Sequence, residues 1–313
     1  MKKLVSIITP MYNEEENIVR YFKEMNKAIK KLEDKYNFEF IITDNCSTDN
    51  TYKLLEEKAK KDKRIKVYTF SKNYGYQRSI WTGYSKSKGD VTIEYDADLQ
   101  DPPVLLEKFL KEWENGNKIV YGIRTHRQES KIFTKLRTLF YFILQKISSN
   151  NLPLNAGDFL MLDRQVIDNL VNIKDQNPYL RGTIFSFGFK RKGIEYKRNS
   201  RQAGKSKFPF YKCLNLAIDA IISQSVFPLR IATYIGLTVT CITIFLSGFY
   251  IFAKFFTDIN MPTGFTTTAV LILFSISINA LFLGIIGEYL ARIYKQVKPE
   301  PITIIEKEIN RSI

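Results

Sequence analysis

The sequence predicts an α/β protein with a mainly parallel sheet, followed by a C-terminal hairpin of two transmembrane helices. In the first 125 residues, short apolar runs alternate with segments of helical periodicity, as in βαβ units. Polar residues gather directly after these runs. Near the C-terminus, residues 231–253 and 265–287 contain no charged side chain. As a helix, each segment covers roughly 34 Å, which is enough to cross the hydrocarbon core of a bilayer.

The N-terminal elements are expected in a regular order. Apolar runs predict strands at residues 4–9, 38–43, 65–70, 91–95 and 119–122. Helices are expected at residues 14–32, 51–61 and 74–87, and from Pro102 or Pro103 to just before Gly116. Asn13 and Glu16 have the spacing of a capping box at the start of the first helix. Ligands of such sheets bind at the carboxyl ends of the strands, here the segments 10–14, 44–49, 71–75 and 96–101.

Two aspartates follow the fourth predicted strand. Asp96 and Asp98 are two residues apart, and side chains with this spacing on extended backbone point the same way. They can therefore hold one hard divalent cation, which suits a diphosphate ligand. The alternative is a simple turn before Pro102 and Pro103, with Asp101 as the N-cap of the next helix.

Composition limits the classes of binding partner but does not select one of them. The 313 residues carry a formal charge of +15, which favours nucleic acid, anionic lipid or phosphorylated ligands. Cys46, Cys213 and Cys241 lack metal-ligand spacing, so we expect ordinary thiols in a reducing compartment. His126 is interpreted as incidental. The apolar run near the N-terminus is too short for a signal peptide, so the first domain is expected in the cytosol.

The membrane interpretation extends beyond the two spans. Residues 131–147 form a basic amphipathic pattern, read either as a core helix or as a helix in the membrane interface, and the spans favour the interface. Arg230 precedes the first span, and Arg292, Lys295 and Lys298 follow the second. The positive-inside rule therefore places both termini in the cytoplasm. We divide the chain into an N-terminal domain (1–207), a juxtamembrane interfacial helix (208–229), the hairpin (230–298) and a cytoplasmic tail (299–313).

The segment from Lys190 to Lys212 carries nine basic residues against a single Glu195. A charge run of this kind is often only a solvated face. Here it precedes a membrane span, where each cation near an anionic surface contributes about 1 kcal/mol. Lipid headgroups or a lipid phosphate are therefore the expected partners, and nucleic acid is not.

Several motifs together resemble family 2 glycosyltransferases of the GT-A fold, and among them the polyprenyl-phosphate glycosyltransferases. This group contains dolichyl-phosphate mannose synthase and bactoprenol glucosyltransferases. The resemblance covers nearly the whole chain, and the segments that carry it are residues 10–14, 44–51, 73–75, 96–103, 157–159, 181–182 and 201–208.

The resemblance implies roles for individual residues. Nucleotide contacts fall to Pro10, Tyr12, Glu14 and Asp44. Asp96, Asp98 and Gln100 are implied to bind Mg²⁺ or Mn²⁺ and the diphosphate. The lipid phosphate is assigned to Arg124, Arg201, Ser206 and Lys207. Asp158 is a candidate catalytic carboxylate, and the alternative for it is a structural role as a cap or as the partner of an arginine.

The expected function follows from these roles. The chain should transfer a hexose, inverting and metal-dependent, from a nucleotide sugar to undecaprenyl or dolichyl phosphate at the cytoplasmic face of the membrane. UDP-glucose is the expected donor, and a GDP-sugar stays open because Asn45 and Cys46 follow Asp44 where the family usually has aspartate and glycine. The resemblance also implies a homo-oligomer, such as a tetramer. The alternatives are a processive membrane glycosyltransferase and a non-catalytic, membrane-tethered scaffold that binds nucleotide sugars.

Overall fold

A computed structural model describes residues 2–125, 153, 156–173, 175–176, 178–199, 229, 232–239, 241–242, 245, 264–298 and 300–310. The chain divides into two compact units. Unit 1 comprises Met1–Cys213 and Glu300–Ile313, and unit 2 comprises Leu214–Pro299. The expected interfacial helices at 131–147 and 208–229 lie outside the described residues, except for Leu229, and so do Arg201, Ser206 and Lys207.

Unit 1 is built on a mixed sheet whose described strands lie in the order β7-β5-β6-β4-β1-β2-β3-β8. The strands are β1 (Lys3–Met11), β2 (Tyr36–Asp44), β3 (Ile65–Phe70), β4 (Val91–Glu94), β5 (Ile119–Arg124), β6 (Ala156–Asp163), β7 (Arg191–Tyr196) and β8 (Ile305–Ile309). β1 pairs in parallel with β2 and β4, β2 with β3, and β5 with β7. β6 runs antiparallel to β4 and β5, and β8 runs antiparallel to β3. The parallel order expected for the first strands is present, and β6 and β8 make the sheet mixed.

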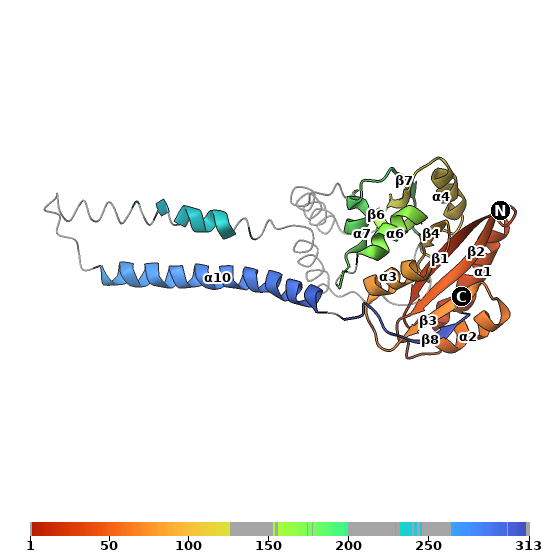
Figure 1. Ribbon diagram of the computed structural model, residues 1–313, viewed down its shortest axis with the longest axis horizontal. Coiled ribbons are helices and arrows are strands. Elements are labelled where there is room, and N and C mark those ends of the chain that lie inside the picture. Colours follow the sequence, from red (N-terminus) through yellow and green to blue (C-terminus); the bar gives the residue numbers. More distant parts are fainter. Residues whose placement is uncertain are drawn as a thin grey trace. The chain divides into compact units, whose positions relative to one another are not determined.

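Helices pack on both faces of this sheet, as Figure 1 shows. They are α1 (Glu15–Lys30), α2 (Thr51–Lys61), α3 (Tyr76–Lys86), α4 (Leu105–Glu114), α6 (Arg164–Asn172) and α7 (Leu180–Ser186). Side chains of α1, α2 and α4 join one core cluster, and those of α3, α6 and α7 join the other. Ile7 belongs to the first cluster and Ile8 to the second, because successive strand residues face opposite sides.

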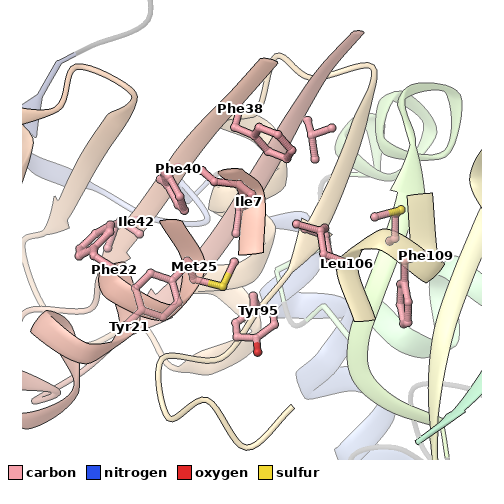
Figure 2. Packing of buried hydrophobic residues seen from close by; sticks show 14 of the residues in the cluster. Ile7, Tyr21, Phe22, Met25, Phe38, Phe40, Ile42, Tyr95, Leu106 and Phe109 are labelled. Atoms are coloured by element: carbon pink, nitrogen blue, oxygen red, sulfur yellow. The ribbon is translucent and has the colours of Figure 1, made fainter. Parts of the chain in front are cut away.

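The first cluster shows why α1 lies against the early strands. Its apolar residues recur with helical spacing, and Phe22 and Met25 are buried against the sheet. Figure 2 shows Phe22 beside Phe40 and Ile42 of β2, and the rings of Phe22 and Phe40 are 5.7 Å apart in an edge-to-face arrangement. This packing fixes α1 and with it the loop that connects β1 to the helix.

The C-terminal segment is part of the same sheet. β8 pairs with β3, with Ile309 opposite Val67, and the side-chain amide of Asn310 donates to the carbonyl oxygens of Ala59 and Ile65. The segment expected to be a tail therefore contains an edge strand. The chain leaves unit 1 after β7 and returns to it before β8.

Unit 2 contains the long apolar helix α10 (Phe265–Val297). Among the described residues, only the part from Phe274 to Val297 has the length and hydropathy of a membrane span. The helix begins where the second span was expected and continues ten residues beyond its expected end at Gly287. The first expected span, 231–253, lies mainly outside the described residues, and 232–239 are helical. A hairpin of two spans is therefore not confirmed.

Candidate active site

The loops after β1 and β2 are bonded to each other at the carboxyl end of the sheet. The backbone amide of Asn13 donates to Ser47 Oγ at 3.0 Å, and Asn13 Oδ1 accepts from the amide of Thr48 at 2.8 Å. Asn13 and Cys46 both have left-handed backbone, with φ of 54° and 60°. Such conformations cost roughly 1–2 kcal/mol and persist where neighbouring contacts enforce them. Asn13 therefore connects two loops and is not the expected helix cap, since α1 begins at Glu15 without a side-chain cap.

Asn45 joins the loop after β3 to this pair. Its Nδ2 donates to Asn73 Oδ1 at 2.9 Å, and its Oδ1 accepts from the amide of Tyr74 at 2.8 Å. The backbone amide of Asn45 donates to the carbonyl oxygen of Met11. The side chain of Asn45, at this departure from the family pattern, thus connects the loops after β2 and β3, because an amide can donate and accept at once. Its backbone amide adds the link to the end of β1.

Asp44 lies at the end of β2 and is fully buried. Its Oδ1 accepts from the amide of Ser47 at 3.1 Å. Among the described residues, Oδ2 is buried without a hydrogen-bond partner. Burial raises the pKa of Asp44, and the hydrogen bonds from Ser47 oppose this increase. A buried acceptor without a donor is unusual, so this oxygen is suited to an N–H or O–H group of a ligand.

The other residues assigned to the nucleotide come from the same loop. Pro10 is in β1, and Tyr12 follows the strand with an exposed side chain. Glu14 precedes α1, where its Oε2 accepts from Asn17 Nδ2 at 2.6 Å. The structure therefore brings Pro10, Tyr12, Glu14 and Asp44 to one edge of the sheet.

The loop that carries Asp96 and Asp98 is a turn. β4 ends at Glu94, residues 97 and 98 form the turn, and Leu99 has left-handed backbone with a φ of 53°. Asp98 Oδ1 accepts from the amide of Gln100 at 3.1 Å. The expectation of extended backbone through Asp98 is wrong, because Asp98 closes the turn through this bond.

Acidic groups and the hydroxyl of Tyr76 lie around Asp96. Tyr76 Oη lies 2.8 Å from Asp96 Oδ1 and 3.2 Å from Glu94 Oε1. Burial and the charges of Asp98 and Asp101 raise the pKa of Asp96 to about 7. Burial and the charges of Asp158 and Asp96 raise the pKa of Glu94 well above its usual range. A cation at this position would stabilise the ionised form of Asp96.

A basic pair lies on another side of Asp96 and is organised by Asp101. This carboxylate is buried and accepts hydrogen bonds from Tyr196 Oη at 2.5 Å and Arg198 Nε at 3.2 Å. Its Oδ2 is 3.7 Å from Arg124 Nη2. Arg198 Nη2 is also 3.7 Å from Asp96 Oδ2. Asp101 is therefore not the cap of α4, which begins at Leu105, and it holds two arginines beside the acidic loop.

Asp158 is held by an arginine. Arg181 Nε and Nη2 both donate to Asp158 Oδ1, at 3.2 and 2.8 Å. The neighbouring Gly157 leaves room for Arg124, since a Cβ there would lie 2.8 Å from Arg124 Nη2. The geometry of Asp158 is thus that of an ion pair between β6 and α7.

The donor set can be compared with the needs of Mg²⁺ or Mn²⁺. Among the described residues, no group of three or more His, Cys, Asp or Glu side chains is arranged as a metal site. Mg²⁺ is commonly held by one or two carboxylates, with substrate phosphates and water completing its coordination. Asp96 and Asp98 fit this type of site, in which the ligand completes the coordination.

Sequence reasoning did not single out Tyr76, Glu94, Tyr196 or Arg198 as site residues. Glu94 lies within an apolar run, and Tyr76 follows a loop without any charge pattern. Arg198 belongs to the expected basic segment, which was the one available signal.

Gln100, which the resemblance assigned to the metal, follows the turn at Asp98. Its carbonyl oxygen accepts from the backbone amide of Asn199 at 2.9 Å.

Comparisons with known proteins show the family to which the chain belongs. Residues 6–171 match the family model described as "Glycosyl transferase family 2". The chain is 35% identical over 303 residues to "Uncharacterized glycosyltransferase YkcC" of Bacillus subtilis (strain 168), covering 96% of this chain and 93% of the relative. It is 33% identical over 304 residues to the "Bactoprenol glucosyl transferase" of Shigella phage SfII, covering 97% of each chain.

Among solved structures, glucosyl-3-phosphoglycerate synthase from Mycobacterium tuberculosis in complex with UDP is similar with a TM-score of 0.46 and 16% identity. The match covers 71% of this chain and 80% of that one. The family model covers more than half of the chain, and the two named relatives match it over nearly its whole length. The protein belongs to glycosyltransferase family 2 and is a glycosyltransferase.

Proposed function

We propose that the protein transfers a hexose from a nucleotide sugar, with UDP-glucose as the preferred donor, to a polyprenyl phosphate at the cytoplasmic face of a membrane. The observation that carries this proposal is the arrangement around Asp96. An acidic loop suited to a cation and a diphosphate lies beside a basic pair, Arg124 and Arg198, suited to a second phosphate. The similarity to bactoprenol glucosyl transferases supports a polyprenyl phosphate as the acceptor.

The donor side uses the loops after β1, β2 and β4. Asp44 Oδ2 is a buried acceptor that suits the N3–H of uracil, and Pro10, Tyr12 and Glu14 line the same edge. Asp96 and Asp98, with Gln100 beside them, would hold Mg²⁺ or Mn²⁺ together with the diphosphate. When bound, the cation offsets the negative charge that develops on the leaving diphosphate.

The acceptor side uses arginines. Arg124 and Arg198 are held near Asp96 by Asp101, and guanidinium groups bind phosphate oxygens in a bidentate manner. Arg201, Ser206 and Lys207 extend this role in the segment that the structure does not describe. The nucleophile is an oxygen of the lipid phosphate, whose second pKa near 6 leaves it largely dianionic at neutral pH.

The transfer step needs no base from the protein. The phosphate oxygen attacks the anomeric carbon from the face opposite the diphosphate, so the configuration inverts. The bond between that carbon and the diphosphate oxygen breaks, and the nucleoside diphosphate leaves with the electron pair. Because the nucleophile is already ionised, Asp158 is not needed as a base, which agrees with its ion pair to Arg181.

Chain connectivity supports two membrane spans. β7 and β8 belong to the same sheet, and unit 2 with α10 lies between them in sequence. A chain that leaves and returns to one folded domain crosses a membrane an even number of times. If α10 is one crossing, a second lies between Cys213 and Gly264, and residues 231–253 are the uncharged segment there. The basic flanks of the two segments support a cytoplasmic position for unit 1.

A donor panel tests this function. Purified full-length protein is incubated with Mn²⁺, undecaprenyl or dolichyl phosphate, and one donor at a time: UDP-glucose, another UDP-hexose or GDP-mannose. The mass of the lipid product is then measured by mass spectrometry. A lipid phosphate heavier by one hexose supports the proposal. Addition of several hexoses indicates a processive enzyme. Binding of nucleotide sugar without any lipid product indicates a scaffold, and either outcome contradicts the proposal.

A further inference from the structure

The side chain of Tyr76 connects α3 to the acidic loop. Tyr76 is the first residue of α3, and its hydroxyl lies 2.8 Å from Asp96 Oδ1. A phenol has one proton to donate. Its distance to Glu94 Oε1 is longer, at 3.2 Å, so the shorter bond is the one to Asp96. The Tyr76 side chain is 39% exposed, so this bond lies at the surface of the site.

The backbone of Tyr76 is fixed on both sides. Before it, Gly75 has a φ of 86°, and its amide donates to Asn73 Oδ1 at 2.9 Å. Further along the helix, Gly83 packs closely on β1, where an added Cβ would lie 3.1 Å from Ile8 Cβ. The hydroxyl of Tyr76 therefore projects from a helix that is fixed at its start and packed on β1. The start of this helix is bonded to the loop after β3, which is in turn bonded to the loop after β2.

The two oxygens of Asp96 face different partners. Oδ1 accepts from Tyr76, and Oδ2 lies 3.7 Å from Arg198 Nη2. A carboxylate with one oxygen held has a defined orientation before any ligand arrives. Groups that orient a metal-binding side chain in this way commonly change metal affinity by about 10- to 100-fold when they are removed.

We propose that Tyr76 is a positioning residue that orients the carboxylate of Asp96 for a metal–diphosphate complex by donating a hydrogen bond to Oδ1. The inference rests on the proposed function, because Asp96 must bind that complex. It adds a residue from α3 to a site that is otherwise built from the strands of the sheet and the loops that follow them.

Tyr84 provides a matched control on the same helix. It lies two turns after Tyr76, and its hydroxyl is 3.4 Å from Glu94 Oε2. Both tyrosines therefore contact Glu94, and Tyr76 has the additional bond to Asp96. Removing each hydroxyl separates an effect on Asp96 from a general effect of α3 or Glu94.

The experiment measures binding of UDP to the full-length protein at increasing Mn²⁺, by isothermal titration calorimetry, with thermal unfolding as the check on folding. In Tyr76→Phe, the Mn²⁺ concentration for half-maximal UDP binding should rise about tenfold or more, at an unchanged melting temperature. Tyr84→Phe should stay within about twofold of the wild type. With saturating Mn²⁺, kcat of Tyr76→Phe should approach that of the wild type.

Two results would overturn the inference while leaving the proposed function intact. One is an unchanged Mn²⁺ requirement in Tyr76→Phe, and the other is an equal rise in both variants. If the wild type binds UDP with no dependence on Mn²⁺, the proposed metal-dependent function fails, and the inference fails with it. The wild-type titration therefore distinguishes the two failures.

Discussion

Two buried glutamates in the same sheet have opposite surroundings. Glu39 in β2 is 4% exposed and Glu94 in β4 is 3% exposed. Glu39 is level with Ser6 of β1, and Glu94 is level with Ile8, so both point to the face that α3 covers. The two residues thus share their burial and differ in their partners.

Glu39 has a full set of donors. Its oxygens accept from Ser6 Oγ at 2.5 Å, from the amide of Lys88 at 2.8 Å and from Lys66 Nζ at 2.5 Å. Glu94 faces two tyrosine hydroxyls, and the carboxylates of Asp96 and Asp158 raise its pKa further. A buried charge with a cation and donors supports the fold, whereas a cluster of like charges is retained for a ligand. Stability should therefore depend on the first region and activity on the second.

Loss of a carboxylate from the acidic loop should have the largest effect. Asp98→Asn removes a charge that we propose binds the cation, so kcat for hexose transfer should fall about 100-fold or more. The melting temperature should stay the same or rise, because repulsion among Asp96, Asp98 and Asp101 decreases. Turnover and thermal unfolding of the purified variant measure both. Near-normal turnover would show that Asp98 does not bind the cation.

Breaking the ion pair between Glu39 and Lys66 should lower stability and leave ligand binding unchanged. Lys66→Met leaves Glu39 buried without its cation, which should lower the free energy of unfolding by about 3 kcal/mol in urea titrations. UDP binding of the folded protein should not change. Adding Glu39→Gln keeps acceptors for Ser6 and Lys88 without the charge, so the double variant should recover most of the loss. An unstable double variant would contradict this reading of the pair.

A change at Asp44 should affect both stability and UDP binding. Folding raises its pKa, so its contribution to stability is fully present below the pKa of the unfolded chain and is lost as pH rises through the folded pKa. Asp44→Asn should therefore stabilise the protein at neutral pH, and this gain should shrink as the pH falls toward 4. UDP affinity should fall about tenfold, because a charged acceptor becomes neutral. Calorimetric titration of UDP and thermal unfolding at several pH values measure both changes.

Asp158→Ala should have the smallest effect on chemistry. Its carboxylate pairs with Arg181, and in the proposed mechanism the lipid phosphate needs no base, so kcat should stay within about threefold of the wild type. The comparison with Asp98→Asn is made in the same assay. A loss as large as that of Asp98→Asn would assign Asp158 the role of general base.

The local pattern of the sequence predicted the first half of the fold well. β1 to β5 and α1 to α4 lie close to their expected positions, because each carries its own periodicity and turn residues. β8 was not expected, since a five-residue strand with three charged residues has little local signal. Its pairing depends on β3, more than two hundred residues away. No strand was expected at β6 either, and its position between β4 and β5 makes the sheet mixed.

The candidate site was predicted in part for the same reason. Asp44, Asp96 and Asp98 follow apolar runs, so their place at strand ends can be read locally. The hydrogen bonds from Tyr76 to Asp96 and from Arg198 to Asp101 join segments that are distant in the sequence. The connection of Asn13 to Thr48 likewise outweighs the local capping pattern. Contacts between loops decide these positions, and a single sequence does not show them.

The most direct test of the account measures release of nucleoside diphosphate from UDP-glucose with and without undecaprenyl phosphate. The full-length protein is assayed with Mn²⁺, and Asp98→Asn serves as the inactive control. We expect release in the wild type that depends on both the lipid phosphate and Mn²⁺, and almost none in Asp98→Asn. Equal release without the lipid, or equal release by the variant, would contradict the account.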